Sequence, residues 1–139
     1  MQTFLPYPSF SESAKALDYR RLGKQRVETK QILMALRGES KGWVNHPAVK
    51  MWRGYETALA VYGMTMCKEW ISRGYKDTLL QYFKDILIEG VKNDDLAYPQ
   101  FSYEFHRSHQ SNLIRKDPEF YGAQFSGVPD DLPYVWSAA

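Results

Sequence analysis

The fold is decided by the stretch PAVKMWRGYETALAVYGMTMCKEWISRG, residues 47–74. Within it, bulky apolar side chains recur every three to four residues, at Trp52, Tyr55, Leu59, Tyr62, Met66 and Trp70. That spacing is typical of one face of an amphipathic helix. Asn45 is a suitable cap for its start, Pro47 suits the first turn, and Gly74 suits the end. The stretch therefore predicts one long helix that buries an aromatic face.

Upstream of this stretch, the sequence predicts an extended arm followed by a second long helix. Residues 1–10 are mostly apolar and contain two prolines, which favour an extended, packed segment over a helix. Ser11 or Ser13 is the expected cap of the helix that follows, which runs to Leu36 with Gly38 just beyond its end. Within this helix a glycine indicates either a break or the close approach of another segment.

Downstream, Asp77 is the expected cap of a third helix that ends at Gly90. Residues 91–139 are aromatic and rich in turn formers, with room for one short helix over residues 103–116. No strand pattern and no internal repeat is convincing. The sequence therefore predicts a single all-α domain over residues 1–139. It has three main helices, a short fourth, an extended N-terminal arm and an irregular aromatic C-terminal tail.

Composition narrows the class of protein. The chain has 139 residues, of which 24% are charged and 44% hydrophobic, as expected for one globular domain with a real core. No apolar run approaches the ~20 residues of a membrane span, and no signal peptide is visible. Cys67 is the single cysteine and cannot form an internal disulfide, which favours a reducing compartment. We therefore predict a cytoplasmic protein that does not bind membranes.

Positive charge is concentrated in one part of the chain, around LDYRRLGKQRVE at residues 17–28. Residues 15–37 contain seven Lys or Arg and two Asp or Glu, a local net charge of +5 against +2 for the whole chain. Helical spacing places Arg21, Lys24, Gln25 and Glu28 on one side. Such a surface is typical of phosphate binding, and a carboxylate within it is a candidate general acid/base acting on nucleic acid. The alternative is an ordinary solvated helix face with ion pairs between successive turns.

Other motifs carry less information. His106 and His109 share one helix face, but two histidines are too few for a zinc site, so contacts to phosphate or to the Glu28 region suit them better. His46 either completes a helix start or contacts a ligand. No phosphate-binding glycine loop, serine-nucleophile elbow or dinucleotide fingerprint is present. A free α-amine remains as a candidate nucleophile, because the ordinary pKa of such a group, roughly 7.7–8, lies well below that of lysine.

Short motifs that lie in order along nearly the whole chain carry a resemblance to a known family. They are MQTFLP at 1–6, LD through RVE at 17–28, NHP at 45–47, SRGYKDT at 72–78, HRSHQ at 106–110, DPEFY at 117–121 and LPYVW at 132–136. By their order and spacing the chain resembles the pyrimidine-dimer DNA glycosylases of the phage endonuclease V type. It looks closest to a phage and bacterial branch of that family.

The resemblance implies an all-α domain that lays its N-terminus across the helix bearing an essential glutamate. Glu28 matches that glutamate by position. In the family, the N-terminal amine attacks the sugar carbon of a damaged nucleotide, the base leaves, an imine forms and β-elimination cuts the strand. The amine itself is the electron sink, so no cofactor and no metal is expected. Because Gln2 is large enough to block removal of Met1, the amine is expected to be that of Met1.

These lines together predict a DNA repair or DNA-processing glycosylase with abasic-site lyase activity, acting on double-stranded DNA, with a monomer favoured. Met1 and Glu28 are the expected catalytic residues. The expected DNA-binding residues are Arg20, Arg21, Lys24, Arg26, His46, His106, His109 and Tyr121. The first alternative is a non-catalytic nucleic-acid-binding module that uses the same basic helix. The second is a helical protein whose aromatic tail packs on another chain.

Overall fold

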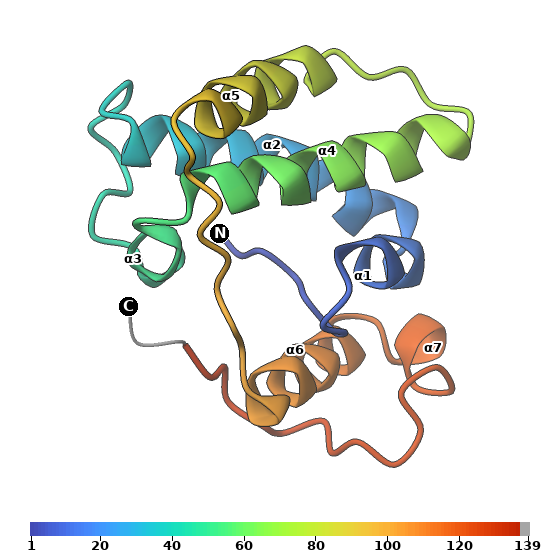
Figure 1. Cartoon of the computed structure of the whole chain (residues 1–139). Helices are drawn as coiled ribbons and strands as arrows, with labels where there is room; N and C mark the ends of the chain where they lie inside the picture. Colours follow the sequence, from blue (N-terminus) through green and yellow to red (C-terminus); the bar gives the residue numbers. More distant parts are fainter. Residues whose placement is uncertain (137–139) are drawn as a thin grey trace.

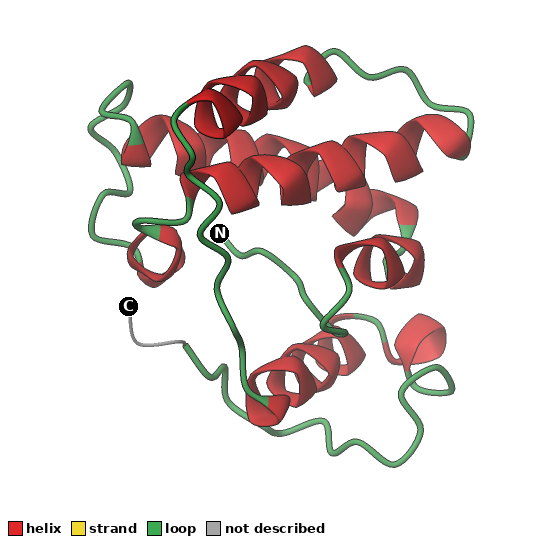
Figure 2. Ribbon diagram, viewed as in Figure 1, coloured by secondary structure: helices red, strands yellow, loops and turns green. Residues whose placement is uncertain are grey.

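Seven helices and their connecting segments make up residues 1–136, the part of the chain that the computed structural model describes (Figure 2). No strand occurs in this part of the chain. The result confirms the predicted single all-α domain. The helices are α1 (Phe10–Ala16), α2 (Tyr19–Leu36), α3 (Pro47–Trp52), α4 (Glu56–Ser72), α5 (Leu80–Lys92), α6 (Tyr103–Lys116) and α7 (Pro118–Tyr121).

The helices form two layers with the N-terminal arm between them (Figure 1). In the first layer, α4 packs against α2, α5 and α1. In the second, α6 packs against α7. The arm, residues 1–9, runs from the side of α3 toward α1 through the space between these layers. The segment that joins α5 to α6 crosses the same region, which brings both halves of the chain onto the arm.

Aromatic side chains fill much of the core. Trp52, Tyr62, Phe83, Phe105 and Tyr121 each have 1% or less of their surface exposed. The aromatic face predicted for the central stretch is therefore a core face, as its periodicity indicates. Burial of large rings accounts for most of the high aromatic content of the sequence. No helix within residues 1–136 is both long and apolar enough to cross a membrane.

The predicted helix from Ser11 or Ser13 to Leu36 is two helices. It is broken at Asp18, whose side chain accepts a hydrogen bond from the Arg21 N–H and so caps α2. The cap of α1 is Ser9 rather than either predicted serine. Gly23 does not break α2. A Cβ there would lie 3.0 Å from the ring of Trp70, so the glycine permits close approach by α4.

The predicted helix over residues 47–74 is also two, α3 and α4. Gly54 separates them with φ +88°, a conformation that glycine adopts without strain. The cap of α3 is His46 rather than Asn45, because the His46 Nδ1 accepts a hydrogen bond from the Ala48 N–H at 3.0 Å. Helix α6 has the predicted bounds, whereas α5 extends two residues beyond Gly90 and α7 was not predicted.

Candidate functional site

The N-terminal arm is held by side chains rather than by another strand. In an extended segment, the N–H and C=O groups of alternate residues point to the same edge. On the even-numbered edge, the Gln2 N–H donates to Glu28 Oε2 at 2.9 Å, and the Gln2 carbonyl accepts from Gln25 Nε2 at 2.9 Å. The Phe4 N–H donates to Gln25 Oε1 at 2.8 Å, and the Tyr62 hydroxyl lies 2.8 Å from the Phe4 carbonyl oxygen. Helices α2 and α4 thus take the place of a neighbouring strand on this edge.

Helix α6 does the same on the odd-numbered edge. The Leu5 N–H donates to His109 Nδ1 at 2.9 Å, and His106 Nδ1 lies 2.8 Å from the Leu5 carbonyl oxygen, to which it donates. Near the start of the arm, Trp52 Nε1 donates to Thr3 Oγ1 at 2.9 Å. The backbone N–H and C=O groups of Gln2, Phe4 and Leu5 are thus satisfied by side chains, which keeps an otherwise costly polar backbone inside the protein. These hydrogen bonds hold the arm in one register, and that register fixes the position of its first residues in the molecule.

Helix α6 also holds the C-terminal tail. The Leu132 N–H donates to Ser111 Oγ at 3.0 Å, and the Val135 N–H donates to Ser108 Oγ at 3.1 Å. Arg115 donates to the Leu132 carbonyl oxygen at 2.9 Å. These contacts bring Tyr134 of the tail to the same cavity that the arm borders. One helix therefore positions the N-terminal arm and residues 132–135 at one place.

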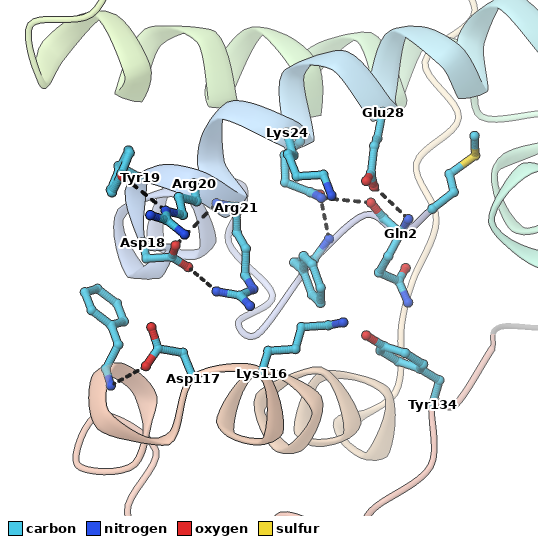
Figure 3. Close-up of a pocket in the computed structure, with 14 residues that line it drawn as sticks. Gln2, Asp18, Tyr19, Arg20, Arg21, Lys24, Glu28, Lys116, Asp117 and Tyr134 are labelled. Carbon is cyan, nitrogen blue, oxygen red and sulfur yellow. Dashed lines mark hydrogen bonds and ion pairs between the residues drawn. The ribbon is translucent and has the colours of Figure 1, made fainter.

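A cavity of about 760 Å³ lies between α2 and the α6–α7 side of the molecule, with the arm along it (Figure 3). Its size falls in the range typical of small-molecule sites. Glu28 and Gln2 lie at one end of it, and Lys116 faces them from α6 (Figure 3). The residues that line it are Met1, Gln2, Phe4, Asp18, Tyr19, Arg20, Arg21, Lys24, Gln25, Glu28, Lys116, Asp117, Phe120 and Tyr134.

Positive side chains surround this cavity. Arg21 is only partly available to a ligand, because its guanidinium forms an ion pair with Asp18 at 3.2 Å. Burial raises the pKa of Asp18, but hydrogen bonds from Tyr121 and Arg21 outweigh burial and hold that pKa below its usual range. Arg20, Lys24 and Lys116 form no ion pair within residues 1–136. The cavity thus offers unpaired cations that suit an anionic ligand.

His46 lies beside the beginning of the arm. Burial and the positive charge of the Met1 amine lower the pKa of His46, and the Glu28 carboxylate partly offsets them. The ring is therefore neutral at pH 7. Its Nδ1 is occupied by the Ala48 N–H, which leaves Nε2 as the nitrogen available to a ligand.

Comparison with protein families identifies the chain. The family described as pyrimidine dimer DNA glycosylase matches residues 1–83, more than half of the sequence. The chain belongs to the pyrimidine dimer DNA glycosylase family. The matched part of this glycosylase includes Met1, the basic helix α2 and Glu28. Membership in this family confirms the resemblance seen in the sequence. It supports the assignment of the chain as a DNA repair glycosylase, whose substrate is DNA. Curated proteins and solved structures gave no match.

Five predicted DNA-binding residues lie outside the cavity lining of this glycosylase: His46, described above, and four more, Arg26, His106, His109 and Tyr121. His109 and Tyr121 have no exposed surface, and His106 is 7% exposed. Burial, with a smaller effect of His106, lowers the pKa of His109 to about 3. The two histidines hold the arm, and Tyr121 donates its hydroxyl proton to Asp18 at the start of α2. Arg26 pairs with Asp77 and lies 4.5 Å from the centre of the Trp70 ring. We withdraw these four from the proposed DNA contacts.

Nine of the fourteen residues that line the cavity of this glycosylase were not among the expected site residues, and three of the nine bear most on its chemistry. Lys116 and Tyr134 line the cavity from the second half of the chain, and Gln25 binds the arm. Helical spacing places Gln25 beside Glu28, but no rule of spacing shows that a glutamine there is buried to 1%. Within residues 1–136, no group of three or more His, Cys, Asp or Glu side chains is arranged to hold a metal ion.

Proposed function

We propose that this protein is a DNA glycosylase with abasic-site lyase activity that works through an imine on duplex DNA. The α-amine of Met1 is the nucleophile, and Glu28 is the general acid/base. One observation carries the proposal: the Gln2 N–H donates to Glu28 Oε2 at 2.9 Å, so Glu28 contacts the arm one residue after the amine, although the amine and the carboxylate form no ion pair. The protein acts as a monomer, because one chain supplies both groups.

The proposed reaction needs only these two groups and the DNA. The Met1 nitrogen forms a bond to the sugar carbon of the damaged nucleotide as the bond to the base breaks, and the base leaves with that electron pair and takes up a proton as the nitrogen loses one. The nitrogen lone pair then breaks the bond between this carbon and the ring oxygen, which takes a proton from Glu28, and the opened sugar is an iminium. Glu28 moves protons on the opened sugar and stabilises the positive iminium. Loss of a sugar proton then drives β-elimination of the 3′ phosphate, which cuts the strand. Hydrolysis of the imine releases the amine.

The cations around the cavity hold the DNA in this proposal. Arg20, Arg21 and Lys24 of α2 contact phosphates on one side, and Lys116 of α6 contacts them on the other. A sugar carbon inside a duplex is out of reach, so the DNA bends or extrudes a nucleotide toward the cavity. His46, with its free Nε2 near the amine, is a further contact of the same strand.

A non-catalytic DNA-binding module is the second candidate, and one observation favours it. The nitrogen in contact with Glu28 is the Gln2 backbone nitrogen, which is an amide and not a nucleophile while Met1 precedes it. In this candidate, the same cations bind DNA and the carboxylate only holds the arm.

Borohydride trapping tests the proposed function. The purified protein is incubated with duplexes that contain an abasic site or a pyrimidine dimer, and borohydride reduces any imine to a stable adduct. We expect a covalent protein–DNA adduct whose peptide map leads to Met1. An adduct on an internal lysine would remove Met1 from the mechanism. A protein that binds both duplexes and forms no adduct on either would favour the binding module.

Lys24→Ala should weaken binding to damaged and undamaged duplexes alike. Lys24 is exposed and lines the cavity, and each phosphate contact adds roughly 0.9 to the slope of log K against log salt. We therefore expect the magnitude of the slope to fall by about 0.9. Fluorescence titrations at several salt concentrations measure it. Lys30→Ala is the matched control, because Lys30 is on the same helix but lies over the Tyr82 ring and outside the cavity. Equal slopes for Lys24→Ala and the wild type would show that Lys24 does not meet DNA.

A further inference from the structure

Gln25 is the one α2 side chain that contacts the arm at two successive points. Its Nε2 donates to the Gln2 carbonyl oxygen at 2.9 Å, and its Oε1 accepts from the Phe4 N–H at 2.8 Å. The Tyr62 hydroxyl lies 2.6 Å from the same Oε1. The orientation of the amide is unambiguous, because a backbone carbonyl requires a donor and a backbone N–H requires an acceptor. Since Gln25 is only 1% exposed, water does not replace these partners.

We propose that Gln25 is a positioning residue, which fixes residues 2–4 in one register and thereby sets where the α-amine lies relative to Glu28. This inference rests on the proposed function. Gln25 and Glu28 are three residues apart on α2, so they act on consecutive groups of the same edge of the arm. A slip by one residue would turn that edge away from both side chains. The contacts of Gln25 and Glu28 therefore fix both the register of the arm and the orientation of its first peptide group.

Gln25→Glu tests the donor half of this contact. The new carboxyl still accepts from the Phe4 N–H and the Tyr62 hydroxyl, but as a carboxylate it cannot donate to the Gln2 carbonyl oxygen. We expect the single-turnover rate of imine formation to fall by about 10–100-fold at saturating abasic duplex, because small misplacements of a reacting group have effects of that order. The Kd for the same duplex should stay within about threefold, since no cavity cation changes.

The pH profile separates positioning from simple loss of structure. A protonated carboxyl can again donate to the Gln2 carbonyl oxygen, so the rate of Gln25→Glu relative to the wild type should rise as the pH falls. The ratio is compared because the other ionisable groups near the start of the arm, Glu28, the Met1 amine and His46, are the same in both proteins. Gln25→Met keeps the length of the side chain and removes both contacts without burying a charge. The rate of imine formation by Gln25→Met should be reduced at every pH. This variant replaces Gln25→Glu as the test if Gln25→Glu does not fold.

Gln110→Glu is the matched control. Gln110 Nε2 donates to the Pro6 carbonyl oxygen at 2.7 Å, so the same substitution removes the same kind of contact further along the arm, away from Glu28. We expect Gln110→Glu to form the imine at a rate within about threefold of the wild type, because the first peptide stays in place. This should hold even if Gln110→Glu and Gln25→Glu lower the Tm by the same amount. If the Gln25 and Gln110 variants lose rate in proportion to their loss of Tm, Gln25 only docks the arm and the proposal is overturned.

Failure of the proposed function gives a different result. A wild-type protein that forms no adduct contradicts the imine chemistry, whatever the Gln25 variants do. The contact is then measured by amide hydrogen exchange. Gln25→Met should speed exchange of the Phe4 N–H, whereas the Leu5 N–H, which is bonded to His109, should change less. Unchanged exchange at Phe4 would overturn the positioning role.

Discussion

Glu28→Gln is expected to lower the rate of strand cleavage by about 10²–10⁴-fold, the usual contribution of a general acid/base. The amide oxygen of the new side chain still accepts from the Gln2 N–H, so the arm keeps its place. The shape of the cavity is also kept. What is lost is the ability to take and return a proton and the negative charge that stabilises an iminium.

Single-turnover cleavage of an abasic duplex measures this loss, and a titration of the same duplex should give a Kd within a few-fold of the wild-type value. Asp117→Asn is the matched control, because Asp117 is another carboxylate that lines the cavity but does not contact the arm. Its cleavage rate should stay close to that of the wild type. Cleavage at near wild-type rate by Glu28→Gln would mean that this carboxylate only holds Gln2.

Extending the chain by two residues before Met1 is expected to abolish both the trapped adduct and strand cleavage. Because Glu28 and Gln25 fix Gln2 in place, added residues do not push the arm inward. The α-amine instead moves outward by roughly 3.3–3.6 Å for each residue, about 7 Å in all. An amine at that distance from the carboxylate is no longer placed for attack. DNA binding should remain, because the cavity cations are untouched.

Mass spectrometry of the intact protein establishes first which residue carries the α-amine in each sample. Borohydride trapping and gel-based cleavage assays then compare the extended and unextended proteins at equal, saturating DNA. Acetylation of the amine is a second way to block it without adding length. An extended protein that still forms an adduct would show that a lysine is the nucleophile, with Lys24 and Lys116 the nearest candidates in the cavity lining.

Several features of this protein follow from local patterns in the sequence. The apolar repeat that includes Leu59, Tyr62 and Met66 fixes which face of α4 is buried, and all three are fully buried. The charge excess in residues 15–37 singled out α2, of which Arg20, Arg21 and Lys24 line the cavity. The ordered motifs identified the family that comparison confirmed. Each of these depends on residues close together in the chain, or on their order along it.

The helix breaks at Asp18 and Gly54 show the limit of periodicity. The apolar period of residues 52–70 continues across Gly54, so the pattern does not mark where one helix ends. Capping decides it at Asp18, whose carboxylate satisfies the start of α2 and is itself fixed by Tyr121, 103 residues away. A break that depends on so distant a partner is absent from any local window.

Only the tertiary structure assigned roles to the buried polar residues. His106 and His109 have the composition of a ligand site, yet they bind the backbone of Leu5, more than 100 residues earlier. Gln25 looks like an ordinary helix-surface residue until the arm covers it. The physical reason is that helical spacing determines which side chains share a face. Which polar side chains on that face are buried depends on the segment that packs against it. The sequence by itself determined the all-α class, the buried face of α4, the basic face of α2 and the family. The tertiary structure decided where the helices break and which side chains hold the N-terminal arm in place.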